Sequence, residues 1–387
     1  MIMTEQKITQ IDKRSWFQRM GSSLKGIFTG LVLFIIAFPL LIWNEGRDIQ
    51  IDRSLREGAS LVTSIDATVV DPQRDGKLIH FTSEARTPSV LTDEAFAISE
   101  NALKLKRTVE IYQWTEEQQT STVEKIGGSS ETSTTYSYKQ IWSEQLIDSS
   151  TFQDKANYPN PQNKILENFE QAASPVSVGV YTLPDRLVSS LADYERLNLA
   201  NDLLISLPYA QQEQWQIFNN YIYQSADPTN PQIGDARIWY QIIKPGLVSV
   251  IAQQNGENLQ AYQTKNGKSI EMIRIGEVSA EEMFAGALQA NRLTSWIIRF
   301  LAFMFMFLGL NTLLAPLTIL VSVIPFFAKI LRFGTKLLSG VIALLLSLVT
   351  IGITWLIYRP LIGVMVLFLA ILVIIIFSRL KKKGAYE

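Results

Sequence analysis

The chain offers few side chains that could act as a nucleophile, a base or a metal ligand. Its 387 residues contain one histidine, His80, and no cysteine. A single histidine cannot form a histidine-based metal site, and the lack of cysteine excludes thiolate nucleophiles, disulfides and cysteine-ligated zinc or iron–sulfur clusters. Serine lies near lysine at 23–25 (SLK) and at 266–269 (NGKS), but a chain this rich in serine produces such matches by chance. We therefore predict no catalytic residue, no cofactor and no metal.

The acidic residues and the common motifs give no support to an enzyme either. The carboxylates occur in polar surroundings such as TEEQQ, DPQRD and SAEE, which are typical of solvated surface or helix caps rather than of a perturbed pKa. No Walker A, G-x-G-x-x-G or G-x-S-x-G sequence occurs, so nucleotide binding and an α/β-hydrolase arrangement have no support. The net charge of −1 gives no electrostatic reason for binding nucleic acid.

Apolar residues concentrate near the start of the chain and in its last third. The predicted transmembrane helices, one N-terminal and three C-terminal, are 26–43, 296–320, 337–358 and 361–377. Each approaches the length of about 20 residues that crosses a bilayer core. The first run has no small-x-small cleavage site, so we interpret it as an uncleaved anchor. The second contains Pro316, where it could instead break and continue as an interfacial or re-entrant helix.

Tyr358, Arg359 and Pro360 lie between the last two apolar runs. Because proline ends one helix and can start the next, we predict a tight hairpin at the membrane surface, with Tyr358 and Arg359 among the headgroups. One kinked helix with arginine at mid-depth is the alternative. It fits worse, since a run of about forty residues exceeds a core of ~30 Å.

Basic residues predict which ends are cytoplasmic. They cluster in the first 25 residues, in 321–336 and in the tail 378–387, so the positive-inside rule places all three on the cytoplasmic side. We expect 321–336 to be a basic loop or an interfacial helix. Residues 44–293 then form an extracytoplasmic domain, periplasmic or lumenal. The absence of an Asn-x-Ser/Thr sequon favours a prokaryotic source and hence a bacterial inner membrane.

The domain 44–293 has mixed patterns, and we predict an α+β fold beside the α-helical membrane bundle. Alternating aromatic-rich stretches predict strands and hairpins, and Ser279 with Glu282 predicts a capping box at the start of a helix that continues into the next span. The predicted strands are 107–114 and 135–142 around a long polar tip, 236–243 paired with 246–254, and two strands flanking the Asn-Gly turn in 259–275. The predicted helices are 162–173, 184–194, 199–224 and 280–293.

Short pieces in order along the chain resemble the transmembrane protein 43 (LUMA) family. They are NEGR (44–47), SLREGASLV (54–62), VEIYQW (109–114), YSYKQIWSEQLIDSSTF (136–152), GDARI (234–238), VSVIAQQ (248–254), TKNG (264–267), SAEEMF (279–284), MFMFLGLN (304–311) and YRPL (358–361). The resemblance implies four spans, cytoplasmic termini and a membrane scaffold that self-associates. In eukaryotes it implies endoplasmic reticulum and inner nuclear membrane, with lamins and emerin as partners. It implies no catalytic residues.

The candidate functional residues are the polar and small residues at the ends or within the apolar runs. They are Asn44, Glu45, Arg47, Arg299, Gly309, Asn311, Tyr358, Arg359 and Pro360. Glu45 and Arg47 could pair with Arg359 or with the ends of neighbouring spans. Glycine at 309 would allow close helix packing, and Asn311 could bond across helices, within one bundle or between subunits.

The favoured interpretation is a non-enzymatic, self-associating membrane scaffold. Its expected partners are membrane lipids, further copies of the chain and unidentified proteins, but not nucleic acid. A transporter or channel subunit is the first alternative, and a membrane-bound serine hydrolase the second.

Overall fold

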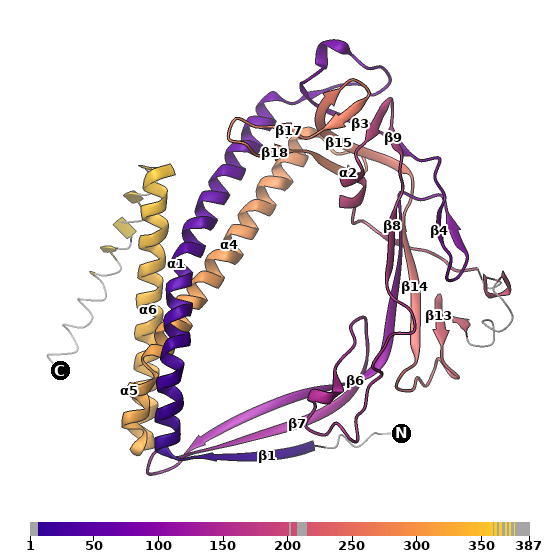
Figure 1. Ribbon diagram of the computed structural model, residues 1–387. Helices are drawn as coiled ribbons and strands as arrows, with labels where there is room; N and C mark the ends of the chain where they lie inside the picture. The colour runs from indigo at the N-terminus through magenta and orange to yellow at the C-terminus, as the bar shows by residue number, and fades with distance from the viewer. Residues whose placement is uncertain are drawn as a thin grey trace. The chain divides into compact units, whose positions relative to one another are not determined.

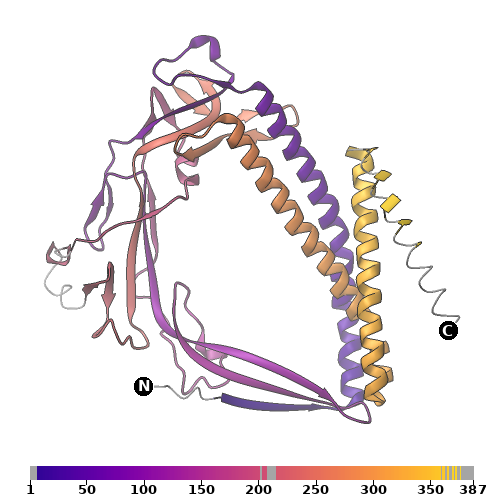
Figure 2. The same ribbon diagram turned by 180° about the vertical axis from the view of Figure 1, so that it is seen from behind.

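The computed structural model describes residues 7–200, 203–206 and 215–358, and beyond these 360, 361, 364, 365, 368, 369, 371, 372 and 375. The chain divides into two compact units. The β-rich unit comprises residues 1–8, 56–119 and 135–284, and the helical unit comprises 9–55, 120–134 and 285–387. Figures 1 and 2 show the elements of each unit from two sides.

The β-rich unit consists mostly of short strands. Its elements are β2 (Thr63–Ser64), η1 (Pro72–Arg74), β3 (Leu78–Arg86), β4 (Leu91–Asp93), β5 (Ile98–Glu100), most of β6 (Lys104–Glu124) and β7 (Ser130–Ser143), η2 (Ser149–Thr151), β8 (Phe169–Ala172), β9 (Val176–Val178), β10 (Tyr181–Leu183), α2 (Asp185–Ser190), β11 (Glu195–Arg196), η3 (Leu203–Ser206), β12 (Gln216–Phe218), β13 (Tyr221–Gln224), β14 (Ala236–Ile243), β15 (Gly246–Asn255), β16 (Asn258–Gln260), β17 (Tyr262–Gln263), β18 (Ser269–Ile270) and β19 (Met272–Ile275).

Two large sheets build this unit, and β17–β18 and β4–β5 form two further two-stranded sheets. The larger has the order β1-β7-β6-β14-β13-β12, with β8 on β6 and β11 on β14. In the other, the order β19-β15-β16-β10-β9-β3-β2 is joined by a further pairing of β15 with β3. That pairing connects β15, β16, β10, β9 and β3 into a ring, in which β10 and β16 are joined at Thr182 and Asn258 alone.

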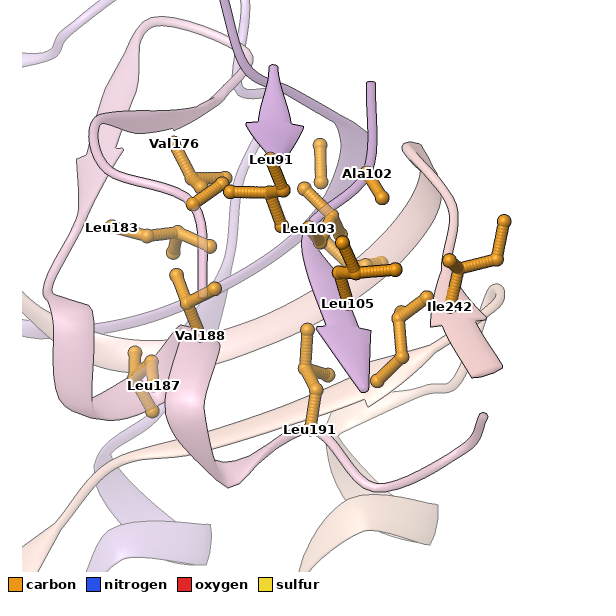
Figure 3. Packing of buried hydrophobic residues seen from close by; sticks show 14 of the residues in the cluster. Leu91, Ala102, Leu103, Leu105, Val176, Leu183, Leu187, Val188, Leu191 and Ile242 are labelled. Atoms are coloured by element: carbon orange, nitrogen blue, oxygen red, sulfur yellow. The ribbon is translucent and has the colours of Figure 1, made fainter. Parts of the chain in front are cut away.

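The core of the β-rich unit follows from alternation along its strands. In β14, Ala236, Ile238, Tyr240 and Ile242 are buried while Arg237, Trp239 and Gln241 between them are only partly buried, as a period of two requires. The cluster extends through Leu103, Leu105, Val176 and the short helix α2. Figure 3 shows Leu191 beside Leu105, and Leu187 and Val188 on the side of Leu183.

The helical unit consists of long apolar helices and one hairpin tip. Its elements are most of β1 (Lys7–Arg14) and α1 (Trp16–Leu61), the ends of β6 and β7 with the turn between them, most of α4 (Ala280–Leu313), α5 (Ala315–Leu320), η4 (Val321–Val323) and α6 (Pro325–Tyr358). Among the described residues, three helices are long and apolar enough to cross a membrane: Trp16–Leu61, Ala280–Val323 and Pro325–Tyr358. The fourth predicted span, 361–377, and the tail 378–387 lie largely or wholly outside the described residues.

Several secondary-structure predictions are confirmed. The stretches 107–114 and 135–142 lie in β6 and β7, and β17 pairs with β18 around the Asn-Gly turn. The Ser279 hydroxyl accepts the backbone N–H of Glu282 at 3.2 Å, and the Glu282 carboxylate accepts the backbone N–H of Ser279 at 3.1 Å. This is the predicted capping box, and α4 runs from it without interruption into the apolar segment. The helix is interrupted beside Pro316, since α4 ends at Leu313 and α5 begins at Ala315. Whether the following segment is interfacial or re-entrant stays a prediction.

The α+β assignment for 44–293 was wrong in its helices. Within the predicted helix 162–173, Phe169–Ala172 forms β8 on β6, and 184–194 holds only the six-residue α2. The described part of 199–224 contains η3, β12 and β13. Pairing within a sheet overrides local helix propensity in these stretches. The domain is therefore β-rich.

One further expectation was wrong. The strands 236–243 and 246–254 do not pair with each other: β14 pairs with β6 and β15 pairs with β3, in different sheets. Of the two forms predicted for 321–336, the structure has the helical one, with η4 at Val321–Val323 and α6 from Pro325. That this helix is interfacial stays a prediction.

Candidate functional site

Three helices bring polar residues to one level of the helical unit. Glu45 follows the apolar run of α1, and Arg299 precedes the apolar run of α4. Trp355 lies near the end of the apolar run of α6. Because α1 and α6 run opposite to α4, these three positions meet at the same end of the bundle (Figure 1). We call the residues gathered there the polar lock.

Glu45 is the centre of the polar lock. Its side chain is fully buried, and Arg299 donates to both carboxylate oxygens, from Nε to Oε1 at 2.6 Å and from Nη2 to Oε2 at 2.8 Å. The indole N–H of Trp355 donates to Oε2 at 2.5 Å. A bidentate arginine contact of this kind is short, strong and specific in geometry. One carboxylate thus joins α1, α4 and α6.

A second set of bonds continues the lock between α1 and α4. Asp48 accepts from the Asn291 amide at 2.7 Å and from the Ser295 hydroxyl at 2.8 Å, while Arg299 Nη2 lies 3.6 Å from its carboxylate. The Asn44 amide donates to the Ser295 carbonyl at 3.2 Å. Residues 291, 295 and 299 are four apart, so they share one face of α4 and all meet α1.

Aromatic rings surround the charged centre. The Arg299 guanidinium lies 5.1 Å from the ring centroid of Trp296 and 5.8 Å from that of Trp355, and the Arg47 guanidinium lies 6.0 Å from Trp43. Tryptophans at the ends of apolar helices are typical of the membrane–water interface. The polar lock therefore lies at an interface level rather than in the middle of the apolar runs.

The contacts of the polar lock join the helices. Glu45 accepts from Arg299 and Trp355, and the Ser295 hydroxyl donates to Asp48. Among the described residues there is no group of three or more metal-ligating side chains. The arrangement holds three helices together.

Four of the predicted residues meet in the lock. Asn44, Glu45 and Arg299 do so as described, and Arg47 Nη2 donates to the Ser295 hydroxyl at 3.1 Å. The partner of Glu45 is the end of a neighbouring span, one of the two possibilities left open. Tyr358 lies at the margin, where its carbonyl accepts from Arg53 at 2.8 Å. Arg359 lies outside the described residues, and Pro360 is exposed.

The other two predicted residues lie farther along α4. Gly309 packs against Gly30 of α1: a Cβ added to Gly309 would come 2.7 Å from the Gly30 carbonyl oxygen. The contact therefore requires glycine. Asn311 is half-buried, and no hydrogen bond of its side chain is found among the described residues.

Sequence reasoning missed several members of these contacts. Asp48, Asn291, Ser295 and Trp355 were not singled out, although the four-residue spacing of Asn291, Ser295 and Arg299 was a usable signal. Gly26 and Gly30 form a G-x-x-x-G pattern, a known sign of close helix packing. Both lie against Thr312 of α4.

A second charged cluster lies at the opposite end of the helices. Glu124, at the tip of the β6–β7 hairpin, binds both Arg19 of α1 and Arg332 of α6. The Gly127 N–H donates to the Val323 carbonyl at 3.0 Å, and Arg19 also donates to the Gly128 carbonyl at 2.6 Å. We call this the tip cluster, and Figures 1 and 2 show the tip beside the start of α1.

The tip cluster bears on the predicted sidedness. Sequence analysis placed Arg19 and Arg332 on the cytoplasmic side and Glu124 on the other. Suppose that the apolar run of α1 crosses the bilayer between Arg19 and Glu45. Glu124 then cannot lie on the extracytoplasmic side and at the same time contact Arg19 on the cytoplasmic side. The sidedness therefore stays a prediction that needs a direct measurement.

Comparison with known proteins finds relatives that cover nearly the whole chain. A family model described as "Transmembrane protein 43" matches residues 111–360. The chain belongs to the transmembrane protein 43 family. It is 32% identical to Transmembrane protein 43 of Mus musculus and 31% identical to that of Homo sapiens, each over 96% of this chain and 94% of the relative. A Drosophila melanogaster homolog is 26% identical over 86% of this chain and 89% of its own length.

No solved structure matches the chain. The family membership confirms the resemblance seen in the sequence, and it agrees with the long apolar helices in identifying a membrane protein. The relatives named are animal proteins, so the prokaryotic source stays a prediction.

Proposed function

We propose that this member of the transmembrane protein 43 family is a non-enzymatic membrane scaffold that self-associates through its helical unit. The observation that carries the proposal is that the two carboxylates of the polar lock are bound to side chains of neighbouring helices. Glu45 contacts Arg299 and Trp355, and Asp48 contacts Asn291 and Ser295. Intramembrane charges of transporters face a cavity or an ion path. Here they join helices, as a structural role requires.

Asn311 supplies the proposed contact between copies. It lies within an apolar segment, it is half-buried, and it finds no hydrogen-bond partner among the described residues. An amide in hydrocarbon gains by bonding to a neighbouring helix. A second copy of the chain offers the same amide, so two copies can satisfy each other.

The first experiment is the mass of the full-length protein in lipid nanodiscs, measured by light scattering with the lipid contribution subtracted. We expect a defined multimer that dissociates on Asn311→Leu and persists in Leu301→Ala, a control at an exposed position of α4 ten residues away. A monomeric wild-type protein would contradict self-association. Ion flux in liposomes that disappears with Asn311→Leu would instead favour a channel subunit.

We also propose four spans with cytoplasmic termini and an extracytoplasmic domain, periplasmic in a bacterium and lumenal in a eukaryote. Because the chain has no cysteine, single introduced cysteines report sidedness directly. Phe17→Cys lies before the apolar run of α1 and Ile126→Cys at the hairpin tip, and both positions are exposed. An impermeant maleimide applied to sealed cells should label Ile126→Cys alone. The same result for both variants, either both labelled or both unlabelled, would favour the tip cluster over the proposed topology.

A further inference from the structure

A groove between α4 and α6 opens beside the polar lock. Its volume is about 350 Å³. The lining residues are Trp296, Arg299, Phe300 and Phe303 of α4, and Leu344, Ser347, Leu348, Ile351 and Trp355 of α6. Apart from Arg299 and Ser347 these side chains are hydrocarbon or aromatic, so the surface of the groove is almost entirely apolar. At one end lies Arg299, which is paired with Glu45 and lies 3.6 Å from Asp48.

The groove has the depth of one leaflet. On α6 it extends from Trp355 to Leu344, eleven residues apart, which at 1.5 Å per residue is about 16 Å. Half of a hydrocarbon core of ~30 Å is about 15 Å. Because Trp355 lies at the interface level of the polar lock, Leu344 lies close to the middle of the bilayer.

The charged end offers a contact for a phosphate. In the bonds described above, Arg299 uses Nε and Nη2 toward Glu45, and no bond from Nη1 is found among the described residues. Arg299 is 13% exposed and lines the groove between two tryptophans. The remaining N–H edge of a guanidinium is a strong donor to phosphate oxygen, and indoles favour the headgroup level.

We infer that this groove binds one phospholipid, with an acyl chain along α4 and α6 and its phosphate at Arg299. The chemistry on both sides agrees: hydrocarbon meets Phe300, Phe303 and Leu348 over one leaflet's depth, and the phosphate meets the cation at the interface. The lipid would fill space between two helices that the polar lock already joins. The inference does not depend on self-association.

The chain's own residues 361–377, which follow α6, are the competing occupant. Those of them that the structure describes do not support this, since Leu361, Val364, Met365 and Phe368 are each more than half exposed and none lines the groove. The test must nevertheless separate the two occupants.

The experiment is native mass spectrometry of the full-length protein in detergent, offered phosphatidylcholine or a diacylglycerol with the same acyl chains. We expect one phosphatidylcholine to be retained and diacylglycerol to bind about tenfold more weakly, since it lacks the acceptor for a charge-assisted hydrogen bond. Leu348→Trp and, as a second variant, Leu344→Trp should lose the lipid by filling the groove. Ile353→Trp, an exposed position on α6 outside the groove, should keep it. Circular dichroism and gel filtration check that each variant is folded.

Three results would overturn the inference. Equal retention of diacylglycerol would remove the phosphate contact. Equal loss in Ile353→Trp would show that the lipid binds elsewhere on α6. Retention only after deletion of residues 359–387 would show that the chain's own C-terminal segment occupies the groove.

Discussion

The two units each bury one carboxylate in the same way, and the comparison shows what such a group does in this protein. In the β-rich unit, Asp93 accepts from Arg107 and from the Tyr240 hydroxyl at 2.8 Å. In the helical unit, Glu45 accepts from Arg299 and from the Trp355 indole. Both carboxylates are nearly or fully inaccessible to solvent. One constellation, a carboxylate held by an arginine and an aromatic donor, thus occurs in a β core and between membrane helices.

The surroundings of the two networks differ. Asp93 joins the β4–β5 hairpin to the larger sheet, and it lies within a packed core. Burial, with the charge of Asp93 beside it, raises the pKa of the Tyr240 hydroxyl far above its ordinary value of 10.0, so the phenol remains a donor at every working pH. Glu45 instead joins helices whose other faces are apolar and exposed. If its arginine is removed, Asp93 remains in a protein core, whereas Glu45 remains between helices that face lipid.

Arg107→Leu should produce the largest effect, because it leaves Asp93 as an unpaired charge in the core. We expect a loss of about 3–5 kcal/mol in the free energy of unfolding of the β-rich unit. Hydrogen–deuterium exchange of the full-length protein, read at the amides of β14, measures it. The double variant Asp93→Leu/Arg107→Leu should recover much of the loss, since replacing both partners by apolar groups is often neutral. If the double variant does not recover stability, the Asp93–Arg107 pair stabilises the unit beyond the neutralisation of its two charges.

Arg299→Leu makes the matching change in the helical unit and should cost less, about 1–3 kcal/mol. Glu45 keeps the Trp355 N–H, and polar groups of separated helices in a membrane also find other partners. The readout is exchange at the amides of α1 and α4 around Glu45 and Arg299 in nanodiscs. Arg299→Lys, which keeps the charge but loses the two-pronged contact, should fall between the wild type and Arg299→Leu. A loss of stability as large as that of Arg107→Leu would show that Glu45 finds no other partner in the membrane.

Gly309→Ala separates packing from polar contacts in the helical unit. The added Cβ would lie 2.7 Å from the Gly30 carbonyl oxygen and 2.9 Å from the Phe34 Cβ, and overpacking of this kind costs about 1–3 kcal/mol. Thermal unfolding of the detergent-solubilised protein should show a lower midpoint. Gly334→Ala on α6 is the matched control, since nothing lies within 4 Å of its added Cβ, and it should be neutral or slightly stabilising. Similar losses in both variants would rule out the α1–α4 contact as the cause.

The sequence predicted the components of these networks better than their connections. Asn44, Glu45 and Arg299 stood out because charged and amide groups at the ends of apolar runs are uncommon. Their pairing was left open, because α1 and α4 are about 250 residues apart and only the folded chain brings them together. Asp93, Arg107 and Tyr240 gave no signal at all, since each is an ordinary strand or turn residue until pairing of β6 with β14 sets Arg107 opposite Tyr240.

The same limit explains the errors in the β-rich unit. The local alternation of β6, β7, β14 and β15 was visible, but which strand pairs with which depends on contacts distant in sequence. The stretch 162–173 has few local features against a helix, and Phe169–Ala172 becomes a strand only because β6 offers it an edge. Elements with a strong period were predictable, and elements defined by their neighbours were not.

A third carboxylate, Glu116, tests what remains when the arginine is absent. It accepts from the Tyr138 hydroxyl at 2.7 Å and from the backbone N–H of Gln153 at 2.6 Å. Burial acts to raise the pKa of Glu116, but these hydrogen bonds and that from Gln118 outweigh it and hold the pKa below its ordinary value of 4.5. Burial and the bond to Glu116 raise the pKa of Tyr138 to about 12.

The pH dependence of this contact follows from the two shifts. A carboxyl with a lowered pKa contributes stability above its ordinary value of 4.5, and this is lost as the pH falls through the folded-state pKa. A phenol with a raised pKa contributes stability below 10.0, and this is lost as the pH rises toward about 12. We therefore expect protection of the Gln153 amide in the full-length protein to be flat between these limits and to fall at both ends. Exchange rates are corrected for their intrinsic dependence on pH.

Tyr138→Phe should remove the fall in Gln153 protection at high pH. It should lower the free energy of unfolding at neutral pH by about 1 kcal/mol, the smallest effect of the series. Tyr158→Phe is the matched control, since Tyr158 stacks on Tyr138 at 3.8 Å between ring centroids and so shares its surroundings. If Gln153 protection still falls at high pH in Tyr138→Phe, a group other than Tyr138 causes that fall. A loss as large as that of Arg107→Leu would mean that the aromatic donor, rather than the arginine, carries most of the stability of these buried carboxylates.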